Sequence, residues 1–178
     1  MLIRTAKGEL IALDGREMAP AAATKDMYMR DGKGDVKLSQ TGALASGVPG
    51  SIAVFDEALR RGGNLTLSDA LLPAAKIAED GFPINRAYAR RIASVQKSLA
   101  QFEASKTLLL PNGMPMEQGD VLKQPDLATT YRGIAKEGPG YFYGGTFAKQ
   151  VEGWMKENGG ILTACLLYTS PSPRDATL

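Results

Sequence analysis

The sequence has no histidine and only one cysteine, Cys165, in its 178 residues. Histidine is the commonest general base and metal ligand at neutral pH, so its absence excludes Ser-His-Asp and Cys-His catalytic sites and histidine-rich zinc sites. A single cysteine can form neither an internal disulfide nor a cysteine cluster. We therefore expect no metal site and no cofactor.

Long apolar runs and clusters of like charge are also missing. No apolar segment approaches the roughly 20 residues that span a bilayer, and the start, MLIRTAKGE, lacks the apolar middle of a signal peptide. The 21 basic and 19 acidic residues are scattered along the chain. These features predict neither a membrane partner nor a nucleic-acid partner, and a composition that is 44% hydrophobic is enough for one core.

The N-terminal region predicts a β-hairpin. Residues Leu2–Thr5 and Glu9–Leu13 are short β-favouring runs on either side of a glycine-containing turn. The second run ends at Asp14-Gly15, a turn pair that tolerates positive φ. Glycines and prolines then mark a loop-rich passage that extends to about residue 50.

Helical patterns dominate after residue 50. A first helix ends at Gly62-Gly63 and carries three apolar residues at helical spacing, Ile52, Phe55 and Leu59. Thr66 and Asp69 form a capping-box pattern that opens a second helix, which ends at Gly81. Pro73 is expected to kink this second helix or to shift its start.

The clearest helical stripe begins after Asn85, a favourable N-cap residue. Its apolar members alternate steps of four and three, and they are Tyr88, Ile92, Val95, Leu99 and Phe102. This spacing predicts one helix that turns a face to the core, and the alternative is a partner-binding coiled coil.

Two more helices are predicted toward the C-terminus. Pro125 and Asp126 are typical of a helix start, and Gly138 ends that helix. A last helix, ended by Gly159-Gly160, is expected to carry three apolar residues on one side, Phe147, Val151 and Trp154. The fold class is therefore α+β: a mostly helical chain with an N-terminal β-hairpin.

Residues 165–178, CLLYTSPSPRDATL, differ from the rest of the chain. Helical periodicity stops and a Ser-Pro-Ser-Pro run begins, which is typical of a disordered end. Back-translation of this segment also resembles a transposon-end adapter used in sequencing libraries. We expect residues 1–164 to be the functional segment and 165–178 to be an artefactual tail.

Most side chains that could carry chemistry have a simple structural interpretation. The pairs Asp56-Glu57 and Glu79-Asp80 are expected on solvated helix faces, and Thr129-Thr130 are expected to bond to their own helix backbone. Arg16 follows a strand end, where a side chain can be aimed at a ligand. On the residues alone it is either a ligand-binding cation or the partner of Glu17 in a surface ion pair worth about 0 to 1 kcal/mol.

Several separated motifs resemble the large chain of the γ-glutamyltranspeptidase family, also called glutathione hydrolases. The resemblance covers about residues 1–163 in order. Its motifs are LDGREMAPAAAT, LSQTGALASGVPGSIAVFDEA, LLPAAKIAEDGFPI, QPDLATTYRGIAKEGPGYFYGG and NGGILT.

The resemblance implies a fold and a role for Arg16. The fold is a part of the four-layer αββα sandwich of N-terminal-nucleophile hydrolases. Arg16 would hold the α-carboxylate of a γ-glutamyl substrate, because a planar guanidinium can donate two parallel hydrogen bonds to a carboxylate. Glu17 would orient the arginine or its loop.

The same resemblance implies that the chain is incomplete and inactive alone. The family's nucleophile is the N-terminal threonine of a small chain that the precursor releases by cutting itself, and no such threonine is found here. No residue of this chain is therefore assigned a catalytic role, Met1 is expected to be an internal methionine, and the missing small chain is the expected protein partner. The resemblance also implies a periplasmic or secreted enzyme.

Two other functions remain open at this point. One is a β-lactam or glutaryl acylase of the same architecture. The other is a helical interaction module without catalytic activity.

Overall fold

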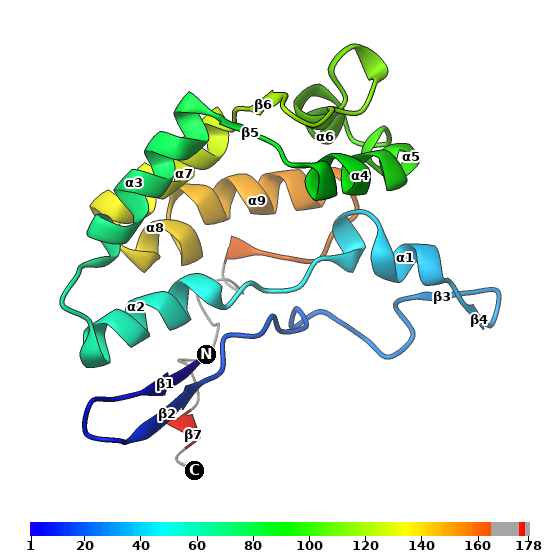
Figure 1. Ribbon diagram of the computed structural model, residues 1–178. Helices are drawn as coiled ribbons and strands as arrows, with labels where there is room; N and C mark the ends of the chain where they lie inside the picture. Colours follow the sequence, from blue (N-terminus) through cyan, green and yellow to red (C-terminus); the bar gives the residue numbers. More distant parts are fainter. Residues whose placement is uncertain (165–174, 177–178) are drawn as a thin grey trace. The chain divides into compact units, whose positions relative to one another are not determined.

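The computed structural model describes residues 1–164 and 175–176 (Figure 1). It divides into two compact units, one made of Met1–Ala70 with Gly133–Leu178 and the other of Leu71–Arg132. The prediction for the tail, 165–178, falls outside the described residues except at Asp175–Ala176, and it stays a prediction.

The predicted N-terminal hairpin is confirmed. Strands β1 (Leu2–Arg4) and β2 (Leu10–Leu13) pair antiparallel, with Ile3 opposite Ile11. Gly8 has a φ of 87°, which the tight connection requires and which glycine adopts without strain. The short strand β7 (Asp175–Ala176) pairs with the other edge of β2.

Short elements interrupt the loop-rich passage between the hairpin and residue 50. Strands β3 (Met29–Arg30) and β4 (Lys33–Gly34) form a tight hairpin, followed by α1 (Val36–Gln40) and the 3-10 turn η1 (Ala43–Ala45). Asp31 and Gly32 both have positive φ, as a two-residue hairpin turn requires. The sequence patterns predict no regular element in this passage.

Three helices and the loops between them form the core of the first unit. They are α2 (Ser51–Gly62), α8 (Pro139–Tyr143) and α9 (Thr146–Glu157). The buried residues include Val48, Tyr143, Ala148, Met155 and Leu162, with Ile52 and Ala53 packed against them.

The apolar stripes of α2 and α9 are only partly turned to the core, since Ile52 and Val151 pack against it while other members are exposed. Phe55 is 45% exposed and Trp154 is 44% exposed, whereas the neighbouring Val54 and Met155 are buried. Small residues such as Ala148 allow helices to approach closely, so the face that carries them becomes the packed face. The largest aromatic residue of α9 is left partly in solvent.

In the second unit, α3 (Leu67–Asp80) packs against α7 (Pro125–Glu137) through alanines. Ala75, Ala78 and Ala128 are almost completely buried. The capping box that opens α3 is confirmed, because Asp69 accepts the Thr66 N–H at 2.8 Å and Thr66 Oγ1 accepts the Asp69 N–H at 3.1 Å. The helix starts where the box predicts and continues through Pro73, so of the two effects expected of Pro73, a kink or a shifted start, the shift does not occur.

The predicted helix from Asn85 to Phe102 is two helices, α4 (Arg86–Ser94) and α5 (Gln96–Leu99). Val95 leaves the helical conformation, with φ −114° and ψ 13°. Two features favour the break: Val95 is β-branched, and the Ser94 hydroxyl donates to the Arg91 carbonyl at 2.8 Å. Asn85 caps α4 as predicted, because its side chain accepts the Tyr88 N–H at 2.9 Å.

The rest of the second unit encloses its own small core. It comprises α6 (Glu103–Leu109), the 3-10 turn η2 (Pro111–Gly113) and the short strands β5 (Phe82–Pro83) and β6 (Val121–Leu122). The buried residues of this core, to which α4 contributes Ile92, are Ile84, Ile92, Leu110, Met116 and Leu122. Of the predicted stripe, only Ile92 is fully buried, and Tyr88 is 42% exposed.

Candidate functional site

The segment that carries Arg16 leaves β2 and runs over the start of α2. Its two ends are anchored in the first unit, since Leu13 and Pro20 are buried. Between them, Met18 and Val48 exchange two backbone hydrogen bonds, Met18 N–H to Val48 O at 3.0 Å and Val48 N–H to Met18 O at 2.7 Å. The backbone around Arg16 is therefore held in place.

Gly15 brings this segment into close contact with the N-terminal turn of α2. A Cβ at Gly15 would lie 2.2 Å from Val54 Cγ2, and a Cβ at Gly50 would lie 2.7 Å from Gly15 O. Both positions therefore require glycine. Gly15 is not among the glycines with positive φ, so this turn does not use the positive φ that the pair tolerates, and the role of Gly15 is close backbone approach.

Asp14 bonds to the backbone of Arg16. Its Oδ1 accepts the Arg16 N–H at 3.0 Å, which is the two-residue pattern of an Asx turn. The sequence pattern had drawn attention to Asp14-Gly15 only as a turn. The Asp-x-Arg spacing could have indicated this bond, because aspartate commonly accepts the N–H two residues ahead.

The guanidinium of Arg16 projects into solvent. Its side chain is 80% exposed, and Nη2 lies 3.2 Å from Glu17 Oε1, whose side chain is 59% exposed. The surface ion pair anticipated from the sequence is therefore present. A pair this exposed contributes about 0 to 1 kcal/mol, so it leaves the guanidinium accessible to an anionic ligand.

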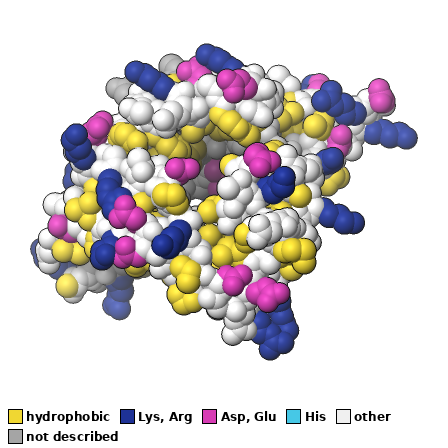
Figure 2. All heavy atoms as spheres, turned by 90° about the horizontal axis from the view of Figure 1, so that it is seen from above, with side chains coloured by type: hydrophobic (Ala, Val, Ile, Leu, Met, Phe, Trp, Pro, Cys, Tyr) yellow, Lys and Arg dark blue, Asp and Glu magenta, His cyan; other side chains and the backbone are white. Residues whose placement is uncertain are grey.

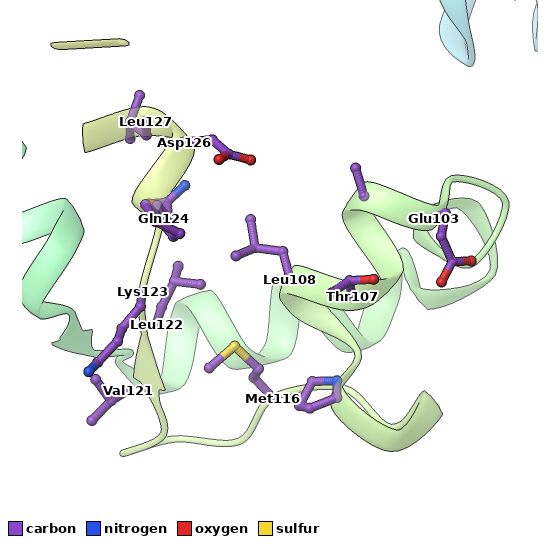
Figure 3. A pocket seen from close by; sticks show the side chains of 13 residues that line it. Glu103, Thr107, Leu108, Met116, Val121, Leu122, Lys123, Gln124, Asp126 and Leu127 are labelled. Carbon is purple, nitrogen blue, oxygen red and sulfur yellow. The ribbon is translucent and has the colours of Figure 1, made fainter. Parts of the chain in front are cut away.

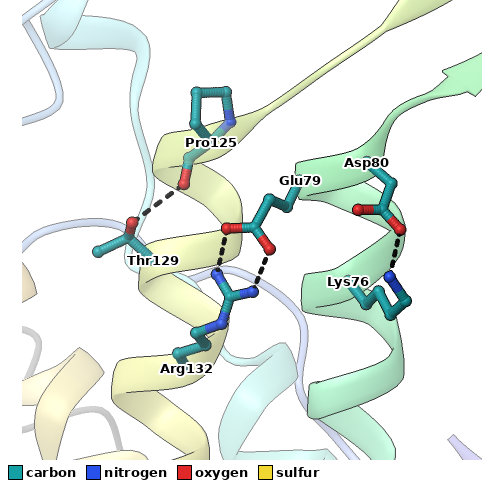
Figure 4. Close-up of polar contacts among 6 residues, drawn as sticks. All are labelled: Lys76, Glu79, Asp80, Pro125, Thr129 and Arg132. Carbon is teal, nitrogen blue, oxygen red and sulfur yellow. Dashed lines mark hydrogen bonds and ion pairs between the residues drawn. The ribbon is translucent and has the colours of Figure 1, made fainter.

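Two other polar candidates bond to their own helix backbone, as predicted. Thr129 and Thr130 donate to the carbonyls of Pro125 and Asp126, four residues earlier, at 3.0 and 2.9 Å. Figure 4 shows Thr129 in this contact, and it shows Glu79 on α3 held by Arg132 on α7. These threonines are not nucleophiles in this geometry.

Two further acidic residues are paired on helix surfaces. Lys76 donates to Asp80 at 2.6 Å, and Glu57 accepts from Arg60 and Arg61, which lowers the Glu57 pKa.

Within residues 1–164 and 175–176, no group of three or more acidic or cysteine side chains is placed to hold a metal ion. The helices of the described residues include none long and apolar enough to cross a membrane.

The described surface also contains hollows. One of about 650 Å³ lies among α6, β6 and the start of α7, where Leu108, Met116 and Leu122 point toward one another (Figure 3). Another of about 580 Å³ lies between the N-terminal hairpin and α2. On the face drawn in Figure 2, basic and acidic side chains are interspersed with apolar ones and are not grouped by sign.

Comparison with known proteins assigns the family. The family model described as "Gamma-glutamyltranspeptidase" matches residues 1–165 of the chain. The chain belongs to the γ-glutamyltranspeptidase family. The resemblance inferred from the sequence motifs is confirmed.

Individual γ-glutamyltranspeptidase relatives agree with this assignment. A glutathione hydrolase proenzyme of Escherichia coli is 44% identical over 165 residues, which are 92% of this chain and 28% of that protein. The crystal structure of Helicobacter pylori γ-glutamyltranspeptidase superposes with a TM-score of 0.92 at 35% identity, over 99% of this chain and 50% of that one. The chain spans about a quarter of the length of the curated relatives that it matches.

Acylases are also among the relatives of this γ-glutamyltranspeptidase chain. The Acylase ACY 1 proenzyme of Pseudomonas sp. (strain V22) is 35% identical over 167 residues, covering 90% of this chain and 30% of that protein. Its identity is lower than that of the glutathione hydrolase from E. coli. An acylase is therefore the more distant of the two comparisons.

Proposed function

We propose that this chain is the large-chain segment of a γ-glutamyltransferase, or glutathione hydrolase, precursor. The intact enzyme moves the γ-glutamyl group of glutathione-like donors to water or to an amino acid. The observation that carries the proposal is the exposed guanidinium of Arg16 on an anchored loop, in a chain of this family.

Arg16 binds the α-carboxylate of the γ-glutamyl group. Its guanidinium presents donors in a rigid fork that matches a carboxylate, which a lysine ammonium does not. Each charge-assisted hydrogen bond contributes about 1.5 to 3 kcal/mol. The weak contact with Glu17 can be exchanged for this stronger one, and Glu17 then orients the arginine or its loop.

The chemical step belongs to the small chain of the same precursor, which is the protein partner of this segment. Its N-terminal threonine attacks the γ-carbonyl carbon through Oγ, while its own α-amine accepts the hydroxyl proton. The C–N bond then breaks, the proton passes to the leaving amine, and a glutamyl-threonine ester remains. Water or an amino acid cleaves that ester and releases the threonine.

The proposal also places this chain in an αββα sandwich. Leu2 and Leu10 lie on one face of the N-terminal hairpin and are 75% and 51% exposed. Ile3 and Ile11 lie on the other face, beside α2. A sheet with apolar residues on both faces is typical of a buried sheet between two other layers, and such an enzyme is periplasmic or secreted in our proposal.

Substitution of Arg16 in the full-length precursor tests the proposal. Arg16→Ala should raise the KM for γ-glutamyl-p-nitroanilide roughly tenfold or more, because the charge-assisted bonds are lost. Arg16→Lys should restore the affinity only in part. Arg30→Ala, another exposed arginine of the same unit, serves as the control and should leave the KM as it is. An unchanged KM in Arg16→Ala would remove Arg16 from the substrate site.

A cephalosporin or glutaryl acylase is the second candidate, favoured by the 35% identity to Acylase ACY 1. The full-length protein should hydrolyse γ-glutamyl-p-nitroanilide much faster than glutaryl-p-nitroanilide, which lacks the α-amino group. The reverse preference would favour the acylase. A mature protein that hydrolyses neither substrate would favour the helical interaction module.

A further inference from the structure

The guanidinium of Arg16 is positioned by the backbone of its loop, because little side-chain packing restrains it. Its side chain is 80% exposed, and its neighbour Glu17 is 59% exposed. Ordering a long exposed side chain and its loop on binding costs conformational entropy. A backbone that is already fixed reduces this cost and so favours binding of the ligand.

We propose that Asp14 is a positioning residue for Arg16 and thereby sets the affinity for the γ-glutamyl group. This inference rests on the proposed function. Asp14 Oδ1 accepts the Arg16 N–H at 3.0 Å and closes an Asx turn around Gly15. The bond fixes the direction in which the Arg16 side chain leaves the chain.

Contacts on the other sides of the loop complete this arrangement. Beneath it, Gly15 lies against Gly50 and Val54 at the start of α2, with no room for a Cβ. On the far side of Arg16, Met18 is tied to Val48 by two backbone hydrogen bonds. The backbone of the loop is therefore restrained on both sides of Arg16 and by its contact with α2. The hydrogen bond to Asp14 is the restraint closest to Arg16 in the sequence.

Asp14 acts here as a hydrogen-bond acceptor and not as a charge. A negative charge two residues from Arg16 does not help to bind a carboxylate, because like charges repel. An asparagine has the same Oδ1 acceptor without the charge. The two properties of Asp14 can therefore be separated by substitution.

Kinetics of the full-length precursor, after self-cleavage, test the role of Asp14. Asp14→Ala should raise the KM for γ-glutamyl-p-nitroanilide about three- to tenfold, as expected for one lost hydrogen bond, and should change kcat less than twofold. Asp14→Asn should restore most of the affinity. In an Arg16→Ala background, Asp14→Ala should add less than a twofold effect, because it acts through Arg16.

Two results would overturn the inference. If Asp14→Asn raises the KM as much as Asp14→Ala, the charge matters, and Asp14 contacts the substrate's ammonium group directly. If Asp14→Ala matches the wild type while Arg16→Ala does not, the Asx turn has no positioning role and the proposed function stands. An Arg16→Ala enzyme with normal KM would instead refute the proposed function.

A second pair of variants tests the contact between the same loop and α2. Gly15→Ala adds a Cβ 2.2 Å from Val54 Cγ2 and 2.9 Å from Val54 Cβ, and it should raise the KM by displacing Arg16. Val54→Gly removes the two closest of these atoms and leaves only Gly50 O, at 3.1 Å, so it should bring the KM of the double variant back toward that of Val54→Gly alone. Self-cleavage, followed on a denaturing gel, shows that each variant has folded. A double variant no better than Gly15→Ala, with normal self-cleavage, would contradict the positioning account.

Discussion

The Tyr143 hydroxyl oxygen accepts the backbone N–H of Ala53 at 3.1 Å, across 90 residues of sequence. This bond joins α8 to the first turn of α2, where backbone N–H groups have no partner within the helix. Tyr143 is buried, and its ring packs edge-to-face against Phe142 at 5.1 Å. The start of α2, on which the Arg16 loop rests, therefore depends on a side chain far along the chain.

Removal of the Tyr143 hydroxyl should loosen the start of α2. In Tyr143→Phe the Ala53 N–H, which is partly buried, loses its acceptor, and this costs about 1 kcal/mol. Amide hydrogen exchange in the full-length precursor should therefore speed up about fivefold or more at Ala53 and its neighbours. Phe142→Leu, which keeps the hydroxyl, is the control. Equal protection at Ala53 in Tyr143→Phe and wild type would show that the bond is not formed.

The same tyrosine predicts a loss of stability at alkaline pH. Burial raises the Tyr143 pKa above its usual value, and the bond from the Ala53 N–H opposes this only in part. A raised pKa in the folded state means that the stabilisation is full below the unfolded pKa, about 10, and is lost as pH rises through the folded pKa. An ultraviolet titration should show a late phenolate step that Tyr143→Phe lacks. A variant with the same titration curve as the wild type would contradict this.

The capping box of α3 predicts the opposite dependence at acid pH. Hydrogen bonds from the Thr66 hydroxyl and the Thr66 N–H lower the Asp69 pKa. Because the folded pKa is depressed, the stabilisation is present above the unfolded pKa, about 3.9, and is lost as pH falls through the folded pKa. The first turn of α3 should lose exchange protection in acid. The loss should be smaller in Asp69→Asn, and an equal loss in both proteins would contradict the role of the carboxylate.

The alanine contact between α3 and α7 predicts sensitivity to side-chain size. Ala128 is 1% exposed and packs with Ala75 and Ala78. Ala128→Leu should cost about 1 to 3 kcal/mol, because overpacking moves backbone or forces strained rotamers. Thr129→Leu, an exposed position next to it, is the matched control and should cost under about 0.5 kcal/mol. Equal melting temperatures for the two variants would contradict close packing.

The ends of elements were the most predictable features of the fold. Thr66 with Asp69, Asn85 and Pro125 each begin a helix where the sequence indicates, because capping depends on residues only a few positions apart. The buried side of a helix depends on its distant neighbours. The exposure of Trp154 could therefore not be predicted, since nothing local shows which face of a helix finds a close partner.

The candidate site was predicted in the same uneven way. Arg16 could be selected because a cation after a strand end, within a family motif, indicates a ligand. The contacts that hold its loop could not be selected, because Gly15 meets Val54 and Met18 meets Val48 across more than 25 residues. The local sequence pattern therefore predicts the functional side chain, whereas the contacts that position its loop are visible only in the structure.

The most direct measurement of the central claim compares two substrates in the full-length precursor. 4-Aminobutyryl-p-nitroanilide has the ammonium group of γ-glutamyl-p-nitroanilide but lacks its α-carboxylate. Arg16→Ala should lower kcat/KM about tenfold or more for the γ-glutamyl substrate and less than twofold for the 4-aminobutyryl substrate. An equal loss on both substrates would contradict the claim that Arg16 binds the α-carboxylate.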